Sequence, residues 1–105
     1  MENIIFLIVR TDAPNSAEKR LAAMEAHIEY TISNKDRFYV GGAIRHIPDA
    51  AALGSAMIVK ADSLDEARAF AAMDPFDKIG IYARTDVWLF NVGVGEWLPE
   101  DLKKF

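Results

Sequence analysis

Apolar residues follow two different patterns along this chain, and together these predict alternating strands and helices. Four segments are short, mostly apolar and rich in β-branched residues, which is typical of strands in a buried sheet. They are the ranges 3–10, 37–44, 54–61 and 82–92. Two other segments repeat their apolar residues every three or four positions, which is the spacing of an amphipathic helix. The predicted order is strand, helix, strand, strand, helix, strand.

The first helical segment follows Ser16, a good N-cap residue, and ends at Asn34. Its apolar side chains fall on one stripe, formed by Ala17, Leu21, Met24, Ile28 and Ile32. His27 lies on the flank of this stripe, about 100° from its centre, at the expected border between core and solvent. A histidine there can carry a proton near neutral pH, because its ordinary pKa is about 6.5. The alternative is a boundary histidine that only hydrogen bonds to a loop carbonyl.

The second helical segment, residues 63–73, ends at an Asp-Pro pair. Ser63 and Glu66 form a capping box at its start. At its end Pro75 removes a backbone donor and pushes Asp74 out of helical geometry. A carboxylate is electrostatically unfavourable at a helix C-terminus. This position indicates a role for Asp74 beyond helix stability, although an exposed turn would also tolerate it.

The element order is that of the ferredoxin-like α+β fold, a four-stranded antiparallel sheet with two helices on one face. Residues 4–9 and 57–59 do not alternate with polar residues, so the second sheet face should not be exposed to water. We therefore expect a homodimer with the two sheets face to face. The pair Gly41–Gly42 suggests a bulge or a close backbone approach in the second strand. Residues 1–92 should form the domain, and the tail 93–105 should dock on the partner subunit or over the mouth of the site.

Composition narrows the classes of function. The chain has 105 residues, no cysteine and a net charge of -4, which suits one small domain and argues against nucleic acid and anionic membranes as partners. No apolar run is long enough to span a bilayer, and no basic region precedes the first one. We expect a soluble cytoplasmic protein. His27 and His46 without cysteine do not make a zinc site, and Gly93-Val94-Gly95 lacks the rest of a dinucleotide motif, so no metal or cofactor is implied.

Several short motifs resemble those of the YciI-like (YCII-related) proteins. They are the helix segment 20–27, Gly54-Ser55, the helix start 63–67, Met73-Asp74-Pro75-Phe76 and Gly80-Ile81-Tyr82. The resemblance covers most of residues 4–90; Ile28 replaces the usual leucine, and the loop 46–53 lacks the usual glycines. It implies a dimeric α+β barrel, similar in fold to muconolactone isomerase. It also implies an active site built on a histidine–aspartate pair, here His27 and Asp74, and a few such proteins are dehydrochlorinases of aromatic breakdown products.

Other side chains are candidates for binding a small-molecule ligand. Ser55, at a strand start, could hydrogen bond to a substrate; an acyl-transfer triad with the His–Asp pair is a weaker possibility, because no nucleophile-elbow pattern surrounds it. Phe76, Tyr82 and Trp88 could line an apolar pocket or belong to the core. Arg10, Arg45 and Arg84 could recognise an anion or be solvated charges at strand ends. Of these, we take Ser55, Phe76 and Arg10 as the binding candidates.

Two classes of function remain open from the sequence. The first is a small cofactor-free enzyme of lyase or isomerase type, in which His27, oriented by Asp74, moves a proton on an aromatic-derived or carboxylated metabolite. The second is a non-catalytic dimeric module that binds a small molecule or acts as an accessory subunit. A closed pocket beside His27 favours the first, and a shallow site with a structurally bonded His27 favours the second.

Overall fold

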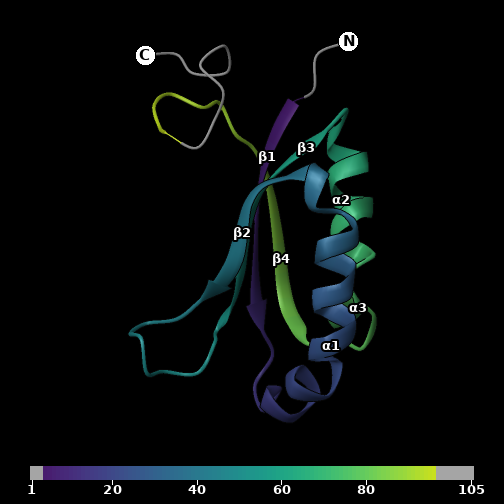
Figure 1. Ribbon diagram of the computed structural model, residues 1–105, viewed down its shortest axis with the longest axis vertical. Helices are drawn as coiled ribbons and strands as arrows, with labels where there is room; N and C mark the ends of the chain where they lie inside the picture. Colours follow the sequence, from purple (N-terminus) through teal and green to yellow (C-terminus); the bar gives the residue numbers. More distant parts are fainter. Residues whose placement is uncertain (1–3, 97–105) are drawn as a thin grey trace.

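The structure, a computed structural model, describes residues 4–96 and confirms the ferredoxin-like α+β fold. Its elements are β1 (Ile4–Asp12), α1 (Ala17–Ser33), the 3-10 turn η1 (Lys35–Arg37), β2 (Phe38–Ile44), β3 (Gly54–Ala61), α2 (Leu64–Ala72), α3 (Pro75–Lys78) and β4 (Tyr82–Leu89). The strands form one antiparallel sheet in the order β2-β3-β1-β4. Helices α1, α2 and α3 lie on one side of this sheet (Figure 1).

Cross-strand register explains which side chains meet the helices. Phe6 pairs with Val59, and Ile8 pairs with Met57, so these side chains share the helix-covered face. The buried cluster on this face is completed by α2. It consists of Phe6, Ile8, Met57, Val59, Ala61, Ala67, Phe70 and Ala71. The core therefore lies between β1, β3 and α2.

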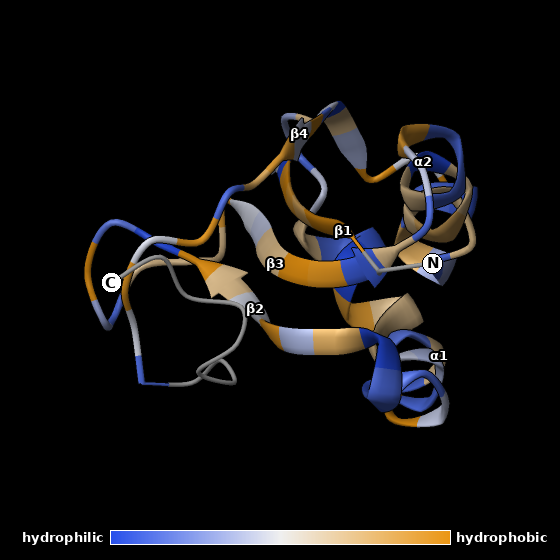
Figure 2. Cartoon of the chain, turned by 90° about the horizontal axis from the view of Figure 1, so that it is seen from above, coloured by the Kyte–Doolittle hydropathy of each residue, from blue (hydrophilic) through white to orange (hydrophobic). Residues whose placement is uncertain are grey.

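The opposite sheet face carries apolar side chains that none of the described helices covers. Leu7 pairs with Ile58 on one side and with Trp88 on the other, and Ile58 also pairs with Val40. Trp88 is 58% exposed, and the other three are partly exposed. Figure 2 shows α1 and α2 on one side of the strands and no helix on the other. We call this surface, formed by Leu7, Val9, Val40, Ile58 and Trp88, the open sheet face.

Several local expectations need correction. The bulge lies between Phe38 and Val40, where Tyr39 is the extra residue, and not at the glycine pair. The last strand ends at Leu89 and not at Val92, whereas the first continues to Asp12. Ser16 occupies the N-cap position of α1, but its hydroxyl donates to the Ala13 carbonyl at 2.6 Å and makes no cap hydrogen bond.

The largest difference from the expected packing concerns α1. Its apolar stripe is not buried against the sheet, and no residue of the helix is fully buried. Leu21, Ile28 and Ile32 are 77%, 46% and 63% exposed. The helix instead contacts α3 and α2 through the flank that carries His27 and Tyr30. The periodicity correctly placed these apolar side chains on one side of the helix, but a periodic pattern does not show what that side packs against.

No helix in residues 4–96 is long and apolar enough to cross a membrane. The large apolar residues of the tail, Trp97, Leu98 and Phe105, lie outside the described residues, so the expected docking of that tail stays a prediction.

Candidate active site

Asp74 stands at the centre of the polar site because the chain changes direction there. The Asp-Pro pair expected to form a turn also starts a further short helix, α3, which sequence reasoning missed. Asp74 is its N-cap residue: its Oδ1 accepts a hydrogen bond from the backbone N–H of Phe76 at 2.9 Å, and Pro75 occupies the first helical position. The carboxylate thus satisfies an otherwise unpaired backbone donor. This role is structural, and it leaves Asp74 fully buried.

His27 reaches Asp74 from the middle of α1. Its Nδ1 lies 2.8 Å from Asp74 Oδ1, and its ring stacks on Phe76 with centroids 4.0 Å apart and planes 5° from parallel. An ionised carboxylate can only accept, so the proton of the neutral imidazole must be on Nδ1. The other ring nitrogen, Nε2, is then unprotonated. The His27 side chain is 19% exposed and lines the pocket.

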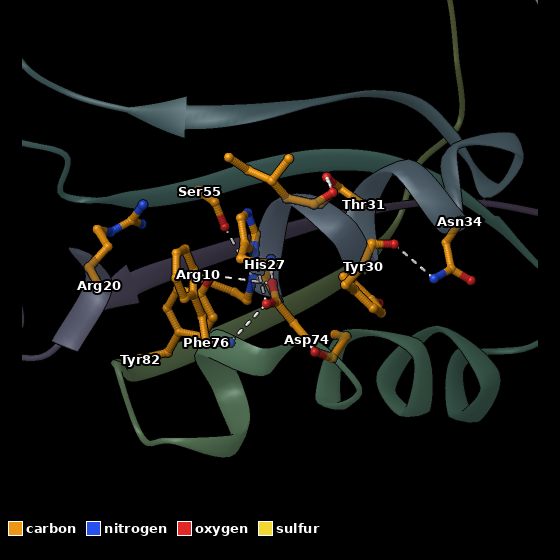
Figure 3. A network of polar contacts seen from close by, with 12 residues as sticks. Arg10, Arg20, His27, Tyr30, Thr31, Asn34, Ser55, Asp74, Phe76 and Tyr82 are labelled. Carbon is orange, nitrogen blue, oxygen red and sulfur yellow. Dashed lines mark hydrogen bonds and ion pairs between the residues drawn. The ribbon is translucent and has the colours of Figure 1, made fainter. Parts of the chain in front are cut away.

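Arg10 approaches the second oxygen of the carboxylate from β1. Its Nη2 lies 2.8 Å from Asp74 Oδ2, its Nη1 donates to the Ala71 carbonyl at 3.3 Å, and its Nε donates to Ser55 Oγ at 3.1 Å. Both Arg10 and Asp74 are buried, so each charge is compensated by the other. Figure 3 shows Arg10, His27 and Phe76 converging on Asp74.

Tyr82 completes this arrangement from the start of β4. The Arg10 guanidinium carbon lies 4.4 Å from its ring centroid, and its hydroxyl donates to Asp74 Oδ2 at 3.5 Å. Burial raises the pKa of Tyr82, whereas Arg10 and a hydrogen bond with Ser55 oppose that rise. The phenol therefore remains a neutral donor at neutral pH.

The protonation state of Asp74 follows from competing effects. Burial alone would raise its pKa, but the hydrogen bond from His27, the charge of Arg10 and the backbone N–H of Phe76 together hold the pKa below its ordinary value. Asp74 is thus ionised at neutral pH. Nearby, burial and the Asp74 charge raise the pKa of Tyr30 to about 12, and its hydroxyl donates to the Phe70 carbonyl at 2.8 Å.

A second arginine, Arg20, lies two helical turns before His27. It begins the helix motif 20–27 that carries the family resemblance, but no role in the site was predicted for it. Its guanidinium binds both carboxylate oxygens of Asp12, at 2.8 Å and 3.3 Å, and its carbon lies 4.8 Å from the Phe76 ring centroid. The seven-residue spacing from His27, which returns a helix to the same face, was the available signal. Phe76 is thus contacted by both residues and is itself fully buried.

A pocket of about 1050 Å³ opens in front of this site, between α1 and the β2–β3 side of the sheet. Arg10, Arg20, His27, Ser55 and Asp74 all belong to its lining. Phe76 lies behind the imidazole and does not line the pocket.

The remaining candidates are divided between the pocket and distant surfaces. Arg45 is at the pocket lining, but Trp88 lies on the open sheet face, and Arg84 forms an exposed ion pair with Asp86. Ser55 is bonded to Arg10; within residues 4–96 no hydrogen bond joins it to His27, so the described contacts do not form a Ser–His–Asp triad.

The chain belongs to the YCII-related domain family, whose model matches residues 4–91. Protein YciI of Escherichia coli is 30% identical over 95 residues, covering 84% of this chain and 97% of that protein. An uncharacterised protein of Haemophilus influenzae is 33% identical over 85 residues, covering 74% of this chain and 87% of its own length.

One solved structure is also similar, that of 5-chloro-2-hydroxyhydroquinone dehydrochlorinase (TftG) from Burkholderia phenoliruptrix in complex with 2,5-dihydroxybenzoquinone. It is 34% identical, with a TM-score of 0.79, over 86% of this chain and 96% of that one. The suspected family resemblance is therefore confirmed.

Proposed function

We propose that this protein is a small enzyme that moves a proton on a hydroxylated, aromatic-derived ring compound, as a lyase or isomerase does. The observation that carries the proposal is the 2.8 Å contact between His27 Nδ1 and the buried Asp74 carboxylate at the wall of a large pocket. A carboxylate on Nδ1 fixes the tautomer and orientation of the imidazole, and it stabilises the imidazolium that forms when Nε2 takes a proton. The similar dehydrochlorinase supports this class of substrate.

In an elimination of this kind, Nε2 of His27 removes a proton from the substrate. The electron pair of the broken bond forms a double bond in the ring, and the leaving group departs with its own bonding pair. For a chlorinated substrate the products are chloride and a proton, which His27 later releases to water. In an isomerisation, the same nitrogen returns the proton to another atom. Arg10 and Ser55, which line the pocket, would contact the substrate, and Arg10 would also hold Asp74. Phe76, buried behind the imidazole, would only hold the ring of His27 in place. No cofactor is required.

The test uses a chlorinated hydroxyhydroquinone as substrate and measures chloride release. His27→Gln should reduce kcat by about 100-fold to 10,000-fold, the usual contribution of a general acid–base group. His46→Gln is the matched control, because His46 is the second of the two histidines and does not line the pocket. Equal loss in both variants, or unchanged turnover in His27→Gln, would contradict the proposal.

A non-catalytic binding module is the second candidate. It is favoured by the structural role of Asp74, which caps α3 and neutralises Arg10 whether or not any reaction occurs. Calorimetry separates the two: binding of 2,5-dihydroxybenzoquinone without turnover of any chlorinated analogue would support the module.

We also propose that two copies associate through the open sheet face. The support is the set of apolar side chains on that face, which no helix within residues 4–96 covers. Large exposed apolar patches on soluble proteins usually mark interaction surfaces.

A further inference from the structure

The pocket extends well past the polar site. Its volume of about 1050 Å³ reaches the upper end of the range usual for whole drug-sized ligands, and a single hydroxylated ring beside His27 would fill only a small part of it. The lining continues along α1 as far as Ile32, then past Lys35 in η1 to Phe38 at the start of β2. The space that a single ring would leave unfilled is continuous with the site, and it is lined by different side chains.

One wall of this extension is the stripe of α1 that the sheet does not bury. Leu21, Met24, Ile28 and Ile32 all line the pocket, and three of them are more than two-fifths exposed. We call these four residues the α1 stripe. Because α1 is anchored through His27 and Tyr30 on its other flank, the stripe has no partner among residues 4–96 that would bury it.

The pocket wall opposite the α1 stripe and the pocket floor are also apolar, and a glycine leaves the floor open. Phe38, Leu53 and Met57 line the side opposite the α1 stripe. Gly41 pairs with Met57 and shares its face, and the missing side chain keeps the floor open. A Cβ at this position would lie 3.3 Å from Met57 Cβ and 3.3 Å from Phe38 Cδ1, so a larger residue would crowd both.

The charged side chains near His27 do not favour an anionic ligand. Arg10 is neutralised by Asp74, and Arg20 by Asp12, with contacts of 2.8 Å in each case. Lys35 and Arg45 also line the pocket, but the four side chains of the α1 stripe are all apolar. A ligand that fits here needs a polar ring at His27 and an apolar part along the α1 stripe. Burying such a part is favourable in proportion to its area.

We infer that the substrate of this enzyme is a hydroxylated ring that carries an extended apolar substituent, an alkyl chain or a second ring, and that the α1 stripe binds this substituent. The inference rests on the proposed function, because it takes the reacting ring to lie beside His27. It makes Ile28 and Ile32 specificity-determining residues that take no part in the proton transfer.

The experiment compares two probes by calorimetry, 2,5-dihydroxybenzoquinone and the same ring carrying a hexyl chain. In the wild type the hexyl probe should bind at least about tenfold more tightly. This gain is less than complete burial of the six-carbon chain would give, because the pocket is open on one side. In Ile28→Gln and Ile32→Gln most of this gain should disappear, while the affinity for the unsubstituted ring stays the same. Ile47→Gln is the control: Ile47 is 61% exposed, against 63% for Ile32, and does not line the pocket.

The possible results separate this inference from the function on which it rests. If the unsubstituted ring binds and the hexyl chain adds nothing, the extended substituent is wrong and the proposed function stands. A gain that persists in Ile28→Gln and Ile32→Gln, or is lost equally in Ile47→Gln, places the chain elsewhere and overturns the inference. If neither probe binds, the proposed function fails and the inference fails with it.

Discussion

Nδ1 of His27 lies 2.8 Å from Oδ1 of Asp74, and the same oxygen accepts the backbone N–H that starts α3. The residue that orients the imidazole is therefore also the one that fixes the chain direction after α2. Arg10 occupies the other carboxylate oxygen at 2.8 Å. A change at Asp74 should consequently affect stability, imidazole orientation and charge balance together.

Asp74→Asn should lower the free energy of unfolding by about 3 to 5 kcal/mol, because it leaves the buried Arg10 charge without its partner. Asparagine can still cap α3, so the loss does not come from the start of this helix. Chemical denaturation measures it, with Asp86→Asn as control, since the exposed Arg84–Asp86 pair should contribute at most about 1 kcal/mol. Adding Arg10→Met should recover part of the loss. Equal, small effects in Asp74→Asn and Asp86→Asn would show that the buried pair contributes little.

The lowered pKa of Asp74 also predicts acid sensitivity. The unfolded carboxyl, with an ordinary pKa of about 3.9, binds protons more readily than the folded one. The stabilisation is therefore complete above the unfolded value and is lost as pH falls below it, through the folded-state pKa. In denaturation measured from pH 7 to pH 3, the difference between wild type and Asp74→Asn should shrink as the solution becomes acidic. A difference that stays constant would mean that Asp74 titrates in its ordinary range.

The tautomer of His27 is a third expectation. Because Asp74 accepts from Nδ1, the neutral imidazole should carry its proton there and leave Nε2 free. Long-range ¹H–¹⁵N spectra recorded at about pH 9, where ordinary histidines are neutral, distinguish the two nitrogens. The exposed His46 is an internal control without such a carboxylate. A protonated Nε2 on His27 would remove its capacity to act as a base toward the pocket.

The sequence predicted the topology because its strongest signals are local. Ser63 accepts from the Glu66 N–H and Glu66 accepts from the Asp62 N–H, close to the expected capping box, and the apolar runs became the four strands. Only part of the candidate site could be predicted from the sequence. His27 and Asp74 were identified from a helix flank, an Asp-Pro pair and a family resemblance, but an arginine at a strand end looks solvated, so the burial of Arg10 against Asp74 could not be foreseen.

Two further features depend on packing that no local pattern encodes. The short helix α3 was expected to be a turn, because an Asp-Pro pair starts either structure equally well. The α1 stripe was found by its period, yet a period does not show that the helix packs through its histidine-bearing flank. This orientation depends on the stacking of His27 on Phe76, 49 residues later in the chain.

The open sheet face leads to the last prediction, which concerns assembly. Leu7, Ile58 and Trp88 are adjacent in the register and stand on the face without helices. If a second copy covers them, the interface should bury well over ~1,200 Å², and light scattering at micromolar concentration should give the mass of a dimer. Trp88→Lys places a charge at this surface and should shift the equilibrium to monomer, because a buried unpaired charge is costly. Ile79→Lys is the matched control, since Ile79 is 45% exposed and follows α3 on the helix side. A monomeric wild type, or equal dissociation in both variants, would show that the open sheet face is not the interface.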